Sequence, residues 1–484
     1  MSGQPNWLGL MDNALALAAQ SQVLAHSGKL TRVSGMTVEA SGIRLPIGSI
    51  CMIEPAPHGE SAGGPPVDAE VLGFNEGHLM LMPTQSTTGL SPGARVAPVE
   101  PAVRRPRLGQ ASHAWTRRTD QARHLPIGAG LLGRIVDAQG QPMDQFGALE
   151  NTECLPIRCR PVNAMNRTPI REPLDTGVRA INTMLTVGRG QRIGLFAGAG
   201  VGKSVLLGMM ARHTNADVIV VGLIGERGRE VREFVDEILG PSGRSRAAVV
   251  VAPADEPALL KIQAANYASA IAEFYRDQGL NVLLLMDSLT RYAMALREVS
   301  LAMGEAPATR GYPASVFARL PELVERAGNG TTGAGSITAF YTVLLEGDDI
   351  HDPVGDSARS HLDGHIVLSR DLADAGHFPA IAIDGSVSRV MTAITAPEHQ
   401  QAARRLRRAW SAYQQNRELI ALGAYSAGAD HEIDRALASW PAIVALMTQN
   451  TDEKADLEAD LLRLQTIAGA LTEKSAGAPN GAPS

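Results

Sequence analysis

The spacing of apolar residues predicts a central α/β region. Over residues 126–395, short apolar runs alternate with stretches of helical periodicity. The clearest runs are Ile193–Ala197, Ala216–Ile224, Ala247–Ala252 and Val282–Asp287, and their length and composition are typical of buried strands. Because strands that alternate with helices usually form parallel sheets, we expect an α/β domain with a largely parallel sheet.

The N-terminal part of the chain has a different pattern. Within residues 1–25, one helical face collects the apolar residues Trp7, Leu8, Met11, Leu15 and Ala18. This predicts an amphipathic helix, which either packs on its own chain or binds a partner. Residues 26–97 carry short alternating runs separated by Gly and Pro, a pattern typical of a small β-barrel or sandwich. Residues 98–125 are rich in Pro and Arg and indicate a linker.

The C-terminal part becomes helical over residues 396–474. Helical periodicity covers Glu398–Leu422, Ile433–Met447 and Asp452–Leu471, so we expect a domain of three helices. The tail at 475–484 contains mainly Ala, Gly, Pro and Ser, a composition typical of disorder.

Composition and charge restrict the class of protein. The net charge is −6 and aromatic residues make up 4% of the chain. A nucleic-acid binder usually carries a basic surplus and stacking aromatics, so these values argue against that class. No apolar run approaches the ~20 residues that span a bilayer, and any membrane contact should be peripheral. The cysteines, Cys51, Cys154 and Cys159, are odd in number and indicate reduced thiols in a cytosolic protein.

A phosphate-binding loop is the strongest motif in the sequence. It has the order Ala197-Gly198-Ala199-Gly200-Val201-Gly202-Lys203-Ser204 and lies between an apolar run and a helix-forming run that opens at Val205. Glycines let successive backbone N–H groups point at phosphate oxygens, and the helix adds its positive end. Lys203 should reach the β- and γ-phosphates of a nucleotide, and Ser204 should bind Mg²⁺. Ala197 stands where the motif usually has Gly, which is tolerable if its φ is negative.

Two further segments place acidic residues after predicted strands. Val282–Asp287 ends in a carboxylate, and Asp287 could hold Mg²⁺ through water or through Ser204. Gly225–Val231 directly follows another apolar run. There Glu226 could polarise the attacking water while Arg227 offsets charge; a solvated helix start with mixed charges explains the same residues equally well.

Two other polar clusters are poor candidates for metal sites. The acidic stretch Glu346–Asp352 lacks the spacing of a calcium loop and is better explained as an acidic loop. His361 and His365 lie four residues apart on a possible helix without an evident third ligand, so we expect a structural role for them.

Several segments resemble the type III secretion ATPases, which are relatives of the rotary ATP synthase subunits. These segments are Phe196–Arg212, Gly225–Val231, Asp287–Glu298, Arg310–Leu320 and Leu362–Arg370. Within that family, Gly335–Leu344 and Ser388–Ala393 look most like the flagellum-specific export ATPases. The resemblance is dense from about residue 126 to 395 and weaker at both ends.

The resemblance implies a chain with a β-barrel, a RecA-like P-loop ATPase core and a helical domain, assembled as a homohexamer. It implies that Glu226 activates water, that Asp287 completes the Mg²⁺ shell and that Arg227 and Arg291 line the γ-phosphate pocket. Arg389 matches the arginine finger that reaches the neighbouring subunit's site, which is worth about 10³–10⁵ in rate in other NTPases.

Two aromatic residues are the candidates for contacts with adenine. Phe378 stands where relatives often have Tyr, and it keeps the stacking face without the hydroxyl. Tyr425 could close the other side of the adenine pocket, although an aromatic between helices often belongs to the core.

The implied function is ATP hydrolysis that delivers and unfolds flagellar export substrates and releases their chaperones. The implied partners are a regulatory stalk protein at the N-terminus, the export gate, a central stalk protein and export chaperones. The implied location is the cytoplasm, peripheral at the inner membrane. Four alternatives stay open: an injectisome ATPase, an ATP synthase catalytic subunit, a ring-shaped RNA translocase and a ring subunit that binds nucleotide without turnover.

Overall fold

The computed structural model describes residues 11, 27–55, 64–99, 123–159, 161–345 and 352–471. The chain forms two compact units, Met1–Arg123 and His124–Ser484, and each is described by itself. Several expectations fall outside the described residues: the N-terminal helix apart from residue 11, most of the linker, the acidic loop at 346–352 apart from its last residue, and the tail.

The first unit contains a closed barrel with the strand order β1-β2-β5-β4-β3-β6. Its strands are β1 (Gly28–Ser34), β2 (Thr37–Ser41), β3 (Ile50–Glu54), β4 (Val67–Asn75), β5 (His78–Pro83) and β6 (Arg95–Pro98). Side chains alternate across the wall, since Cys51 and Ile53 are fully buried while Met52 between them is not. Closure of the barrel leaves no unpaired sheet edge. The alternating runs predicted a small barrel or sandwich, and the family resemblance implied the barrel.

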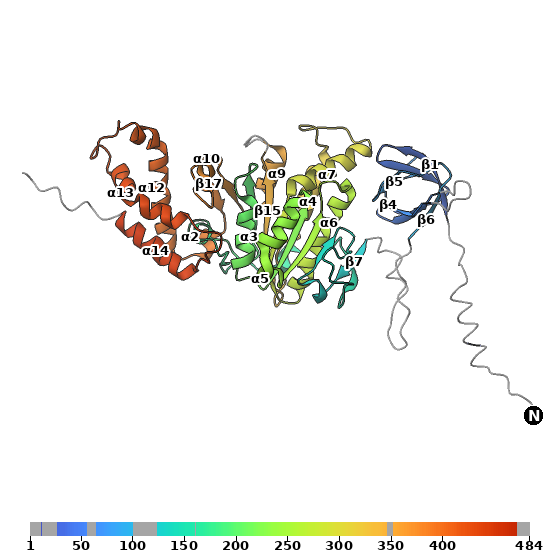
Figure 1. The fold of residues 1–484 in the computed structure, drawn as a ribbon, viewed down its shortest axis with the longest axis horizontal. Helices are drawn as coiled ribbons and strands as arrows, with labels where there is room; N and C mark the ends of the chain where they lie inside the picture. The colour runs from blue at the N-terminus through green and yellow to red at the C-terminus, as the bar shows by residue number, and fades with distance from the viewer. Residues whose placement is uncertain are drawn as a thin grey trace, which may run out of the picture. The chain divides into compact units, whose positions relative to one another are not determined.

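The second unit is organised around a central sheet that includes β15 and β17 (Figure 1). The sheet has nine strands in the order β17-β16-β10-β15-β13-β11-β12-β8, with β14 paired to β15. The strands are β8 (Ile135–Asp137), β10 (Arg192–Ala197), β11 (Val218–Ile224), β12 (Ala247–Ala252), β13 (Asn281–Asp287), β14 (Gly328–Asn329), β15 (Ser336–Leu344), β16 (Gly364–Leu368) and β17 (Ile381–Ser388). All pairs are parallel except β14 with β15 and β16 with β17. A separate antiparallel pair joins β7 (His124–Ile127) and β9 (Glu153–Pro156).

Helices cover both faces of this sheet. The helices of this unit before residue 396 are α2 (Arg179–Met184), α3 (Lys203–His213), α4 (Gly228–Glu233), the π-helical segment η4 (Phe234–Leu239), α5 (Gly240–Arg244), α6 (Ala258–Asp277), α7 (Leu289–Ala302), α8 (Ala314–Val324), α9 (Pro353–His361), α10 (Arg370–Asp374) and α11 (Met391–Ile394), with 3₁₀ turns at η2 (Ala129–Leu131) and η3 (Ala164–Asn166). Ile219 and Val221 of β11 pack in one core with Leu207 of α3. Gly222, the residue after Val221, faces α6, where an added Cβ would lie 3.2 Å from the Cβ of Ala268.

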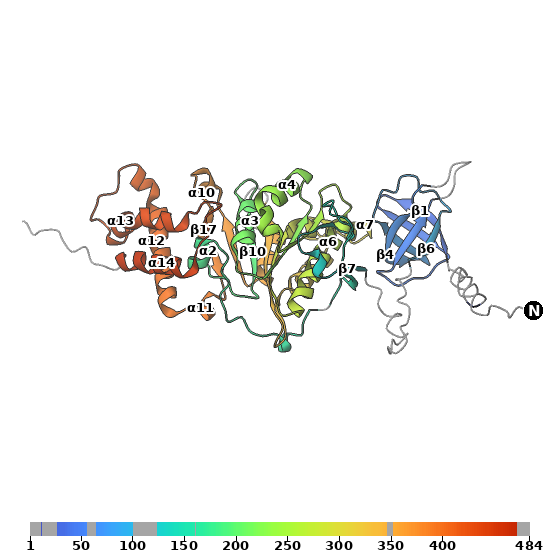
Figure 2. The same ribbon diagram turned by 60° about the horizontal axis from the view of Figure 1, so that its bottom comes forward.

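Three further helices complete the unit: α12 (Pro397–Ala421), α13 (His431–Met447) and α14 (Leu457–Ala470). They pack against one another and against α2 (Figure 2). Their core contains the buried Trp410, and Trp440 stacks on Tyr413 with ring centroids 3.6 Å apart. In the described part of the chain, no helix is long and apolar enough to cross a bilayer. The structure thus confirms the predicted fold class of barrel, α/β core and helical region.

The helical pattern misplaced the start of the last helix, which begins at Leu457 and not at Asp452. Asp456 caps it by accepting a hydrogen bond from the backbone N–H of Ala459 at 2.9 Å. Residues 448–456 form no helix and instead run along the core.

The two histidines expected on one helix lie on different elements. His361 ends α9, whereas His365 belongs to β16, because Asp363 between them is bound by Arg192 and turns the chain into the sheet. The described residues contain no group of three or more His, Cys, Asp or Glu side chains arranged to hold a metal ion. The three cysteines are free, as predicted.

Candidate active site

The phosphate loop lies between the end of β10 and the start of α3. Gly200 and Gly202 have φ values of +78° and +90°, which side chains rarely adopt, so glycine is needed at both positions. Ala197 is the last residue of β10 and pairs with Leu344 of β15, and it is not among the residues of positive φ. The strand conformation explains why Ala is tolerated at the first position of the motif.

Lys203, the first residue of α3, lies between two carboxylates. Its Nζ donates to Glu226 Oε1 at 3.2 Å and to Asp287 Oδ1 at 2.5 Å. Asp287 Oδ1 also accepts a hydrogen bond from Thr342 Oγ1 at 2.7 Å. These four residues follow or belong to the neighbouring strands β10, β11, β13 and β15, and parallel strands bring their carboxyl ends to one edge of the sheet.

Burial and charge together set the protonation of this cluster. The side chains of Lys203, Glu226 and Asp287 are 11%, 14% and 3% exposed. Burial acts to lower the pKa of Lys203, but Asp287 and Glu226 outweigh it and raise the pKa above its ordinary value. Burial raises the pKa of Asp287 against the pull of the lysine. Lys203 therefore stays cationic at neutral pH and available to a phosphate group.

The oxygen donors at this position fit Mg²⁺ bound together with a nucleotide. Mg²⁺ is usually held by one or two protein oxygens together with phosphate oxygens and water, not by an all-protein cage. Asp287 offers a buried carboxylate, and Ser204 offers a hydroxyl in the first turn of α3.

The structure places Arg227 and Arg291 beside the cluster but not in it. Arg227 is 80% exposed, with its Nη1 3.7 Å from Glu230. Arg291 is exposed in the first turn of α7, where its Nη1 contacts Met294 Sδ at 3.8 Å. Its side chain crosses Gly225 so closely that an added Cβ there would lie 2.9 Å from Arg291 Cβ. Both guanidiniums would have to turn to meet a γ-phosphate.

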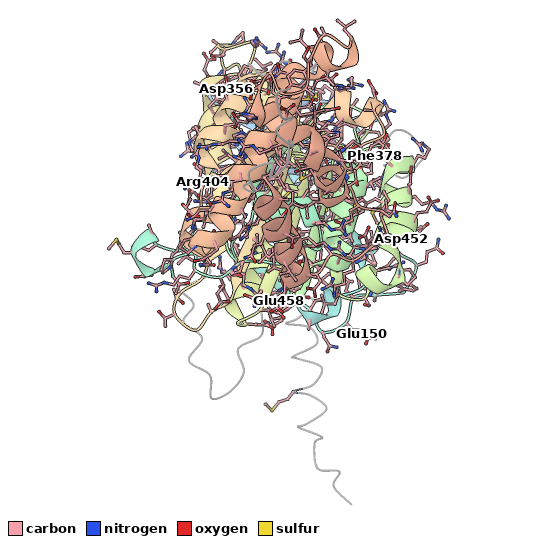
Figure 3. All side chains as sticks on the ribbon, turned by 90° about the vertical axis from the view of Figure 1, so that its left-hand side faces the viewer. Glu150, Asp356, Phe378, Arg404, Asp452 and Glu458 are labelled. Atoms are coloured by element: carbon pink, nitrogen blue, oxygen red, sulfur yellow. The ribbon has the colours of Figure 1, made fainter. Side chains whose placement is uncertain are left out.

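A pocket of about 790 Å³ adjoins the phosphate loop. One side is formed by α3 and the loop at Phe378, and the other by residues 449–453. Phe378 is 47% exposed and lies near Gly202. Phe378 and Asp452 both line the pocket and project on the same flank of the unit (right in Figure 3). The apolar lining from Val201, Val205, Leu206, Met209 and Leu368 suits a nucleobase.

The structure does not bring Tyr425 to this pocket, so its assignment there is corrected. Tyr425 lies between α12 and α13, and its hydroxyl donates to Asp434 Oδ1 at 2.8 Å. The pocket instead meets the chain just after the other end of α13, at Gln449. A helix of 17 residues separates the two places by about 25 Å.

Arg389 lies at the edge of the sheet opposite to the phosphate loop. It follows Ser388, which pairs with Gly364 at the start of β16. Its backbone N–H donates to Asp363 O at 3.0 Å, and its Nη2 donates to Arg359 O at 3.1 Å. Six residues of β10 separate the two edges, a length of about 20 Å. Arg389 is therefore too far from the phosphate loop of its own chain to act there.

Sequence reasoning missed three contributors to the site. Thr342 fixes Asp287, and a polar residue inside the apolar run of β15 is the signal that could have found it. Arg370 donates to Ala199 O of the phosphate loop at 3.2 Å. The third contributor is the wall at residues 449–453, which has no local motif.

Comparison with known proteins follows the same division of the chain. The model of the ATP synthase alpha/beta family, nucleotide-binding domain, matches residues 177–388. The model of the T3SS EscN ATPase C-terminal domain matches residues 395–466. A flagellum-specific ATP synthase of Salmonella typhimurium is 53% identical over 461 residues, covering 95% of this chain and 98% of the relative. The chain belongs to the flagellum-specific ATP synthase family.

Other members of the family and a solved structure extend this result. The flagellum-specific ATP synthase of Bacillus subtilis is 45% identical over 444 residues, covering 91% of this chain and 95% of that protein. The assembled ATPase EscN from the type III secretion system of enteropathogenic E. coli superimposes with a TM-score of 0.81 at 40% identity, covering 91% of this chain and 100% of EscN. Family membership confirms the resemblance predicted from the motifs, and with it a nucleotide-binding ATPase.

Proposed function

We propose that this protein is the Mg²⁺-dependent ATP hydrolase of flagellar type III protein export, and that ATP turnover delivers and unfolds export substrates and releases their chaperones. The observation that carries the proposal is Lys203 held between Glu226 and Asp287 beside the pocket. The higher identity to the flagellum-specific relative, 53% against 40% for EscN, favours the flagellar apparatus over the injectisome.

The contacts of Lys203 indicate how the site responds to ATP. The β- and γ-phosphates compete with Glu226 and Asp287 for the ammonium group of Lys203, because that group can form charge-assisted hydrogen bonds with either kind of anion. When Lys203 moves to the phosphates, Glu226 is released to orient a water molecule. The water oxygen attacks the γ-phosphorus, the bond to the β-phosphate oxygen breaks, and the water proton leaves toward Glu226.

Ser204 and Asp287 are the residues that would hold Mg²⁺. When bound, Mg²⁺ neutralises charge on the phosphate groups. Thr342 keeps the Asp287 carboxylate oriented at the end of β13 through its 2.7 Å hydrogen bond. Orientation by such an outer partner is a general requirement for ligands of metal ions.

Arg389 supports a site that a neighbouring subunit completes. The residue lies too far from its own phosphate loop, yet it matches an arginine finger in sequence. A homohexamer, in which each subunit offers Arg389 to the next site, resolves this conflict. The solved EscN is described as an assembled ATPase, and each chain of the homohexamer carries both Glu226 and Arg389.

The remaining assignments follow the relatives. A central stalk protein is a proposed partner, since a solved structure shows EscN in complex with its central stalk EscO. The regulatory stalk protein at residues 1–25, the export gate and the chaperones are proposed by family resemblance. The same resemblance proposes a cytoplasmic protein, peripheral at the inner membrane.

Two measurements test the proposed function. Specific ATPase activity should rise cooperatively with protein concentration, and a concentration-independent value would contradict the completed-site model. A strain with Lys203→Ala should lose motility and filament assembly. The exposed barrel lysine in Lys29→Ala provides the matched control, and equal motility of the two strains would contradict a role for this site in export.

A further inference from the structure

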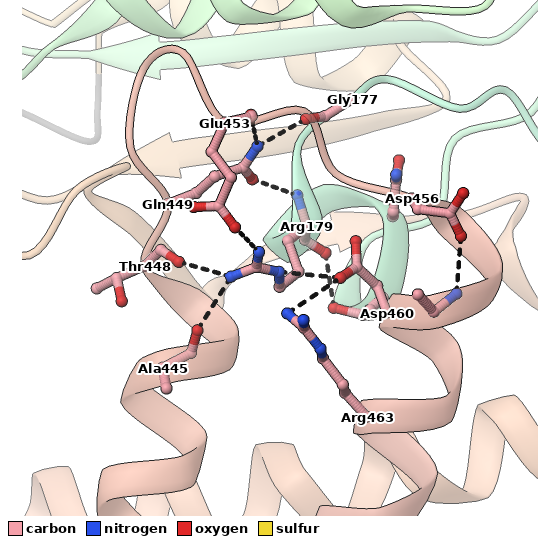
Figure 4. Close-up of polar contacts among 12 residues, drawn as sticks. Gly177, Arg179, Ala445, Thr448, Gln449, Glu453, Asp456, Asp460 and Arg463 are labelled. Atoms are coloured by element: carbon pink, nitrogen blue, oxygen red, sulfur yellow. Dashed lines mark hydrogen bonds and ion pairs between the residues drawn. The ribbon is translucent and has the colours of Figure 1, made fainter.

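Arg179, the first residue of α2, is buried and directs its whole guanidinium at the C-terminal helices (Figure 4). Its Nε donates to Asp460 Oδ1 at 2.9 Å. Its Nη1 donates to the carbonyl oxygens of Ala445 at 3.1 Å and Thr448 at 3.0 Å. Its Nη2 pairs with the carboxylate of Glu453. A single side chain therefore connects α2 to α13, to α14 and to the segment between them.

Gln449 forms a second connection at the same place. Its Oε1 accepts a hydrogen bond from the backbone N–H of Arg179 at 2.8 Å, and its Nε2 donates to Gly177 O at 2.8 Å and Glu453 O at 2.7 Å. Its own backbone N–H donates to Phe378 O at 2.9 Å. Both N–H groups of the Gln449 side-chain amide and one acceptor position of its oxygen are thus used within the protein, so this side chain holds the wall.

These contacts hold one wall of the pocket beside the phosphate loop. Residues 449–453 line that pocket, and they lie in the connection between α13 and α14, which has no helix or strand of its own. The segment therefore lacks a hydrogen-bond ladder to fix it. Its position depends on side-chain contacts: Arg179 and Gln449 hold its two ends at 449 and 453, while Arg212 contacts Thr451 O and Asp452 between them.

Arginine suits this place better than any other cation. Its planar group carries five N–H donors in a fixed fork, whereas lysine has one nitrogen. Only such a fork can reach two carboxylates and two carbonyl oxygens that lie in different directions. Asp460 is 2% exposed, so a weaker partner would leave its charge poorly compensated.

We propose that Arg179 is a positioning residue for the base side of the nucleotide site. It fixes the segment at 449–453 against the core, so that binding of the adenine moiety depends on it while binding of the phosphates does not. The inference rests on the proposed function, because it assigns a role within the ATP site. A plain structural clamp would explain the same contacts but would not separate base from phosphate.

The test compares ligands with and without a base in the full-length protein. In Arg179→Lys, KM for ATP should rise about tenfold, the low end for a damaged apolar contact in a pocket, and kcat should stay within about twofold, since uniform binding alone is lost. Inhibition by ADP should weaken by the same factor, whereas inhibition by inorganic pyrophosphate should not change.

Arg463 offers a matched control, because it contacts the same Asp460 carboxylate from the exposed side of α14. Arg463 lies 3.9 Å from Asp460 Oδ1 and is 60% exposed, and Arg463→Lys should leave every constant unchanged. If Arg179→Lys does not fold, Glu453→Gln takes its place, because it weakens one contact of Arg179 and keeps the side-chain volume. The same separation of ADP from pyrophosphate is expected, with a smaller change.

Three results would overturn the inference: an unchanged KM, a parallel loss of ADP and pyrophosphate affinity, or the same change in Arg463→Lys. Direct binding of ADP to the variants gives the readout without turnover. A wild-type protein that fails to hydrolyse ATP but binds ADP would therefore count against the proposed function and leave the positioning role measurable.

Discussion

The two ends of the nucleotide site are built in different ways. At the phosphate end, Lys203, Glu226 and Asp287 follow or end strands of one sheet, and backbone hydrogen bonds between strands fix their positions. At the base end, Phe378 and the segment at 449–453 come from loops, and side chains such as Arg179 hold them. In the proposed mechanism, the chemistry is therefore carried by residues at or just after strand ends, whereas affinity for the base depends on contacts between distant parts of the chain.

Loss of Arg389 should give the largest effect, because it removes charge stabilisation from the phosphate end of a neighbouring site. Arg389→Ala should lower kcat by about 10³–10⁵ and leave ADP affinity unchanged, since the chain's own pocket keeps its lining. Steady-state ATPase assays and ADP titration measure both values. The exposed Arg404→Ala on α12 is the control. Near-normal turnover in Arg389→Ala would reduce this residue to a surface contact.

Glu226→Gln tests the phosphate end within one chain. We expect kcat to fall by about 10²–10⁴, the range for a lost general base. ATP should bind at least as tightly, because Lys203 loses one competing carboxylate. Glu230→Gln, a change in a carboxylate that pairs with Arg227, provides the control. Unchanged hydrolysis in Glu226→Gln would show that another group activates water.

Phe378→Ala addresses the base end, and its effect should be smaller and of another kind. Base stacking on an aromatic ring contributes roughly 1–3 kcal/mol, so KM for ATP should rise by about tenfold or more while kcat changes little. Phe378→Tyr keeps the stacking face and should behave as wild type. A fall in kcat without a rise in KM would assign Phe378 to the phosphate end and contradict the division of the site into two ends.

The smallest effect concerns the helix that follows the base-side wall. Asp456→Ala removes the N-terminal cap of α14 and should cost about 1 kcal/mol of stability. The thermal midpoint should fall by about 2–4 °C, with KM for ATP near its wild-type value. Asp456→Asn keeps a capping oxygen and should restore most of the midpoint. A tenfold rise in KM for ATP would mean that the cap of α14, and not Arg179, positions the pocket wall at residues 449–453.

The difference between the phosphate end and the base end also explains which parts of the site the sequence could predict. The phosphate loop, Glu226 and Asp287 stand at the ends of apolar runs, so the local pattern predicted their places at strand ends. For Glu226 a solvated helix start explained that pattern equally well, and only the family resemblance implied its role. Alternation, which reflects burial directly, predicted a small barrel or sandwich, and the resemblance implied the barrel. The strand-end motifs and the alternation both depend on residues that are close in the sequence or on the regular geometry of a sheet.

The base end needed information that no local pattern carries. Tyr425, which follows the first C-terminal helix, is the aromatic candidate that the sequence offers, but the pocket is lined by the connection after the second helix. The last helix starts later than its periodicity suggests, because Gln449 and Glu453 are held by Arg179, which lies far away in the sequence. Contacts of this kind depend on how helices pack and are not encoded in spacing.

Mixing two inactive variants tests most directly whether a neighbouring subunit completes each site. Arg389→Ala keeps Glu226, and Glu226→Gln keeps Arg389, so an interface between the two variants contains one intact site. The account predicts that a mixture, assembled at high protein concentration, hydrolyses ATP well above the sum of the two separate preparations. Activity equal to that sum, in a mixture shown to co-assemble, would contradict the account.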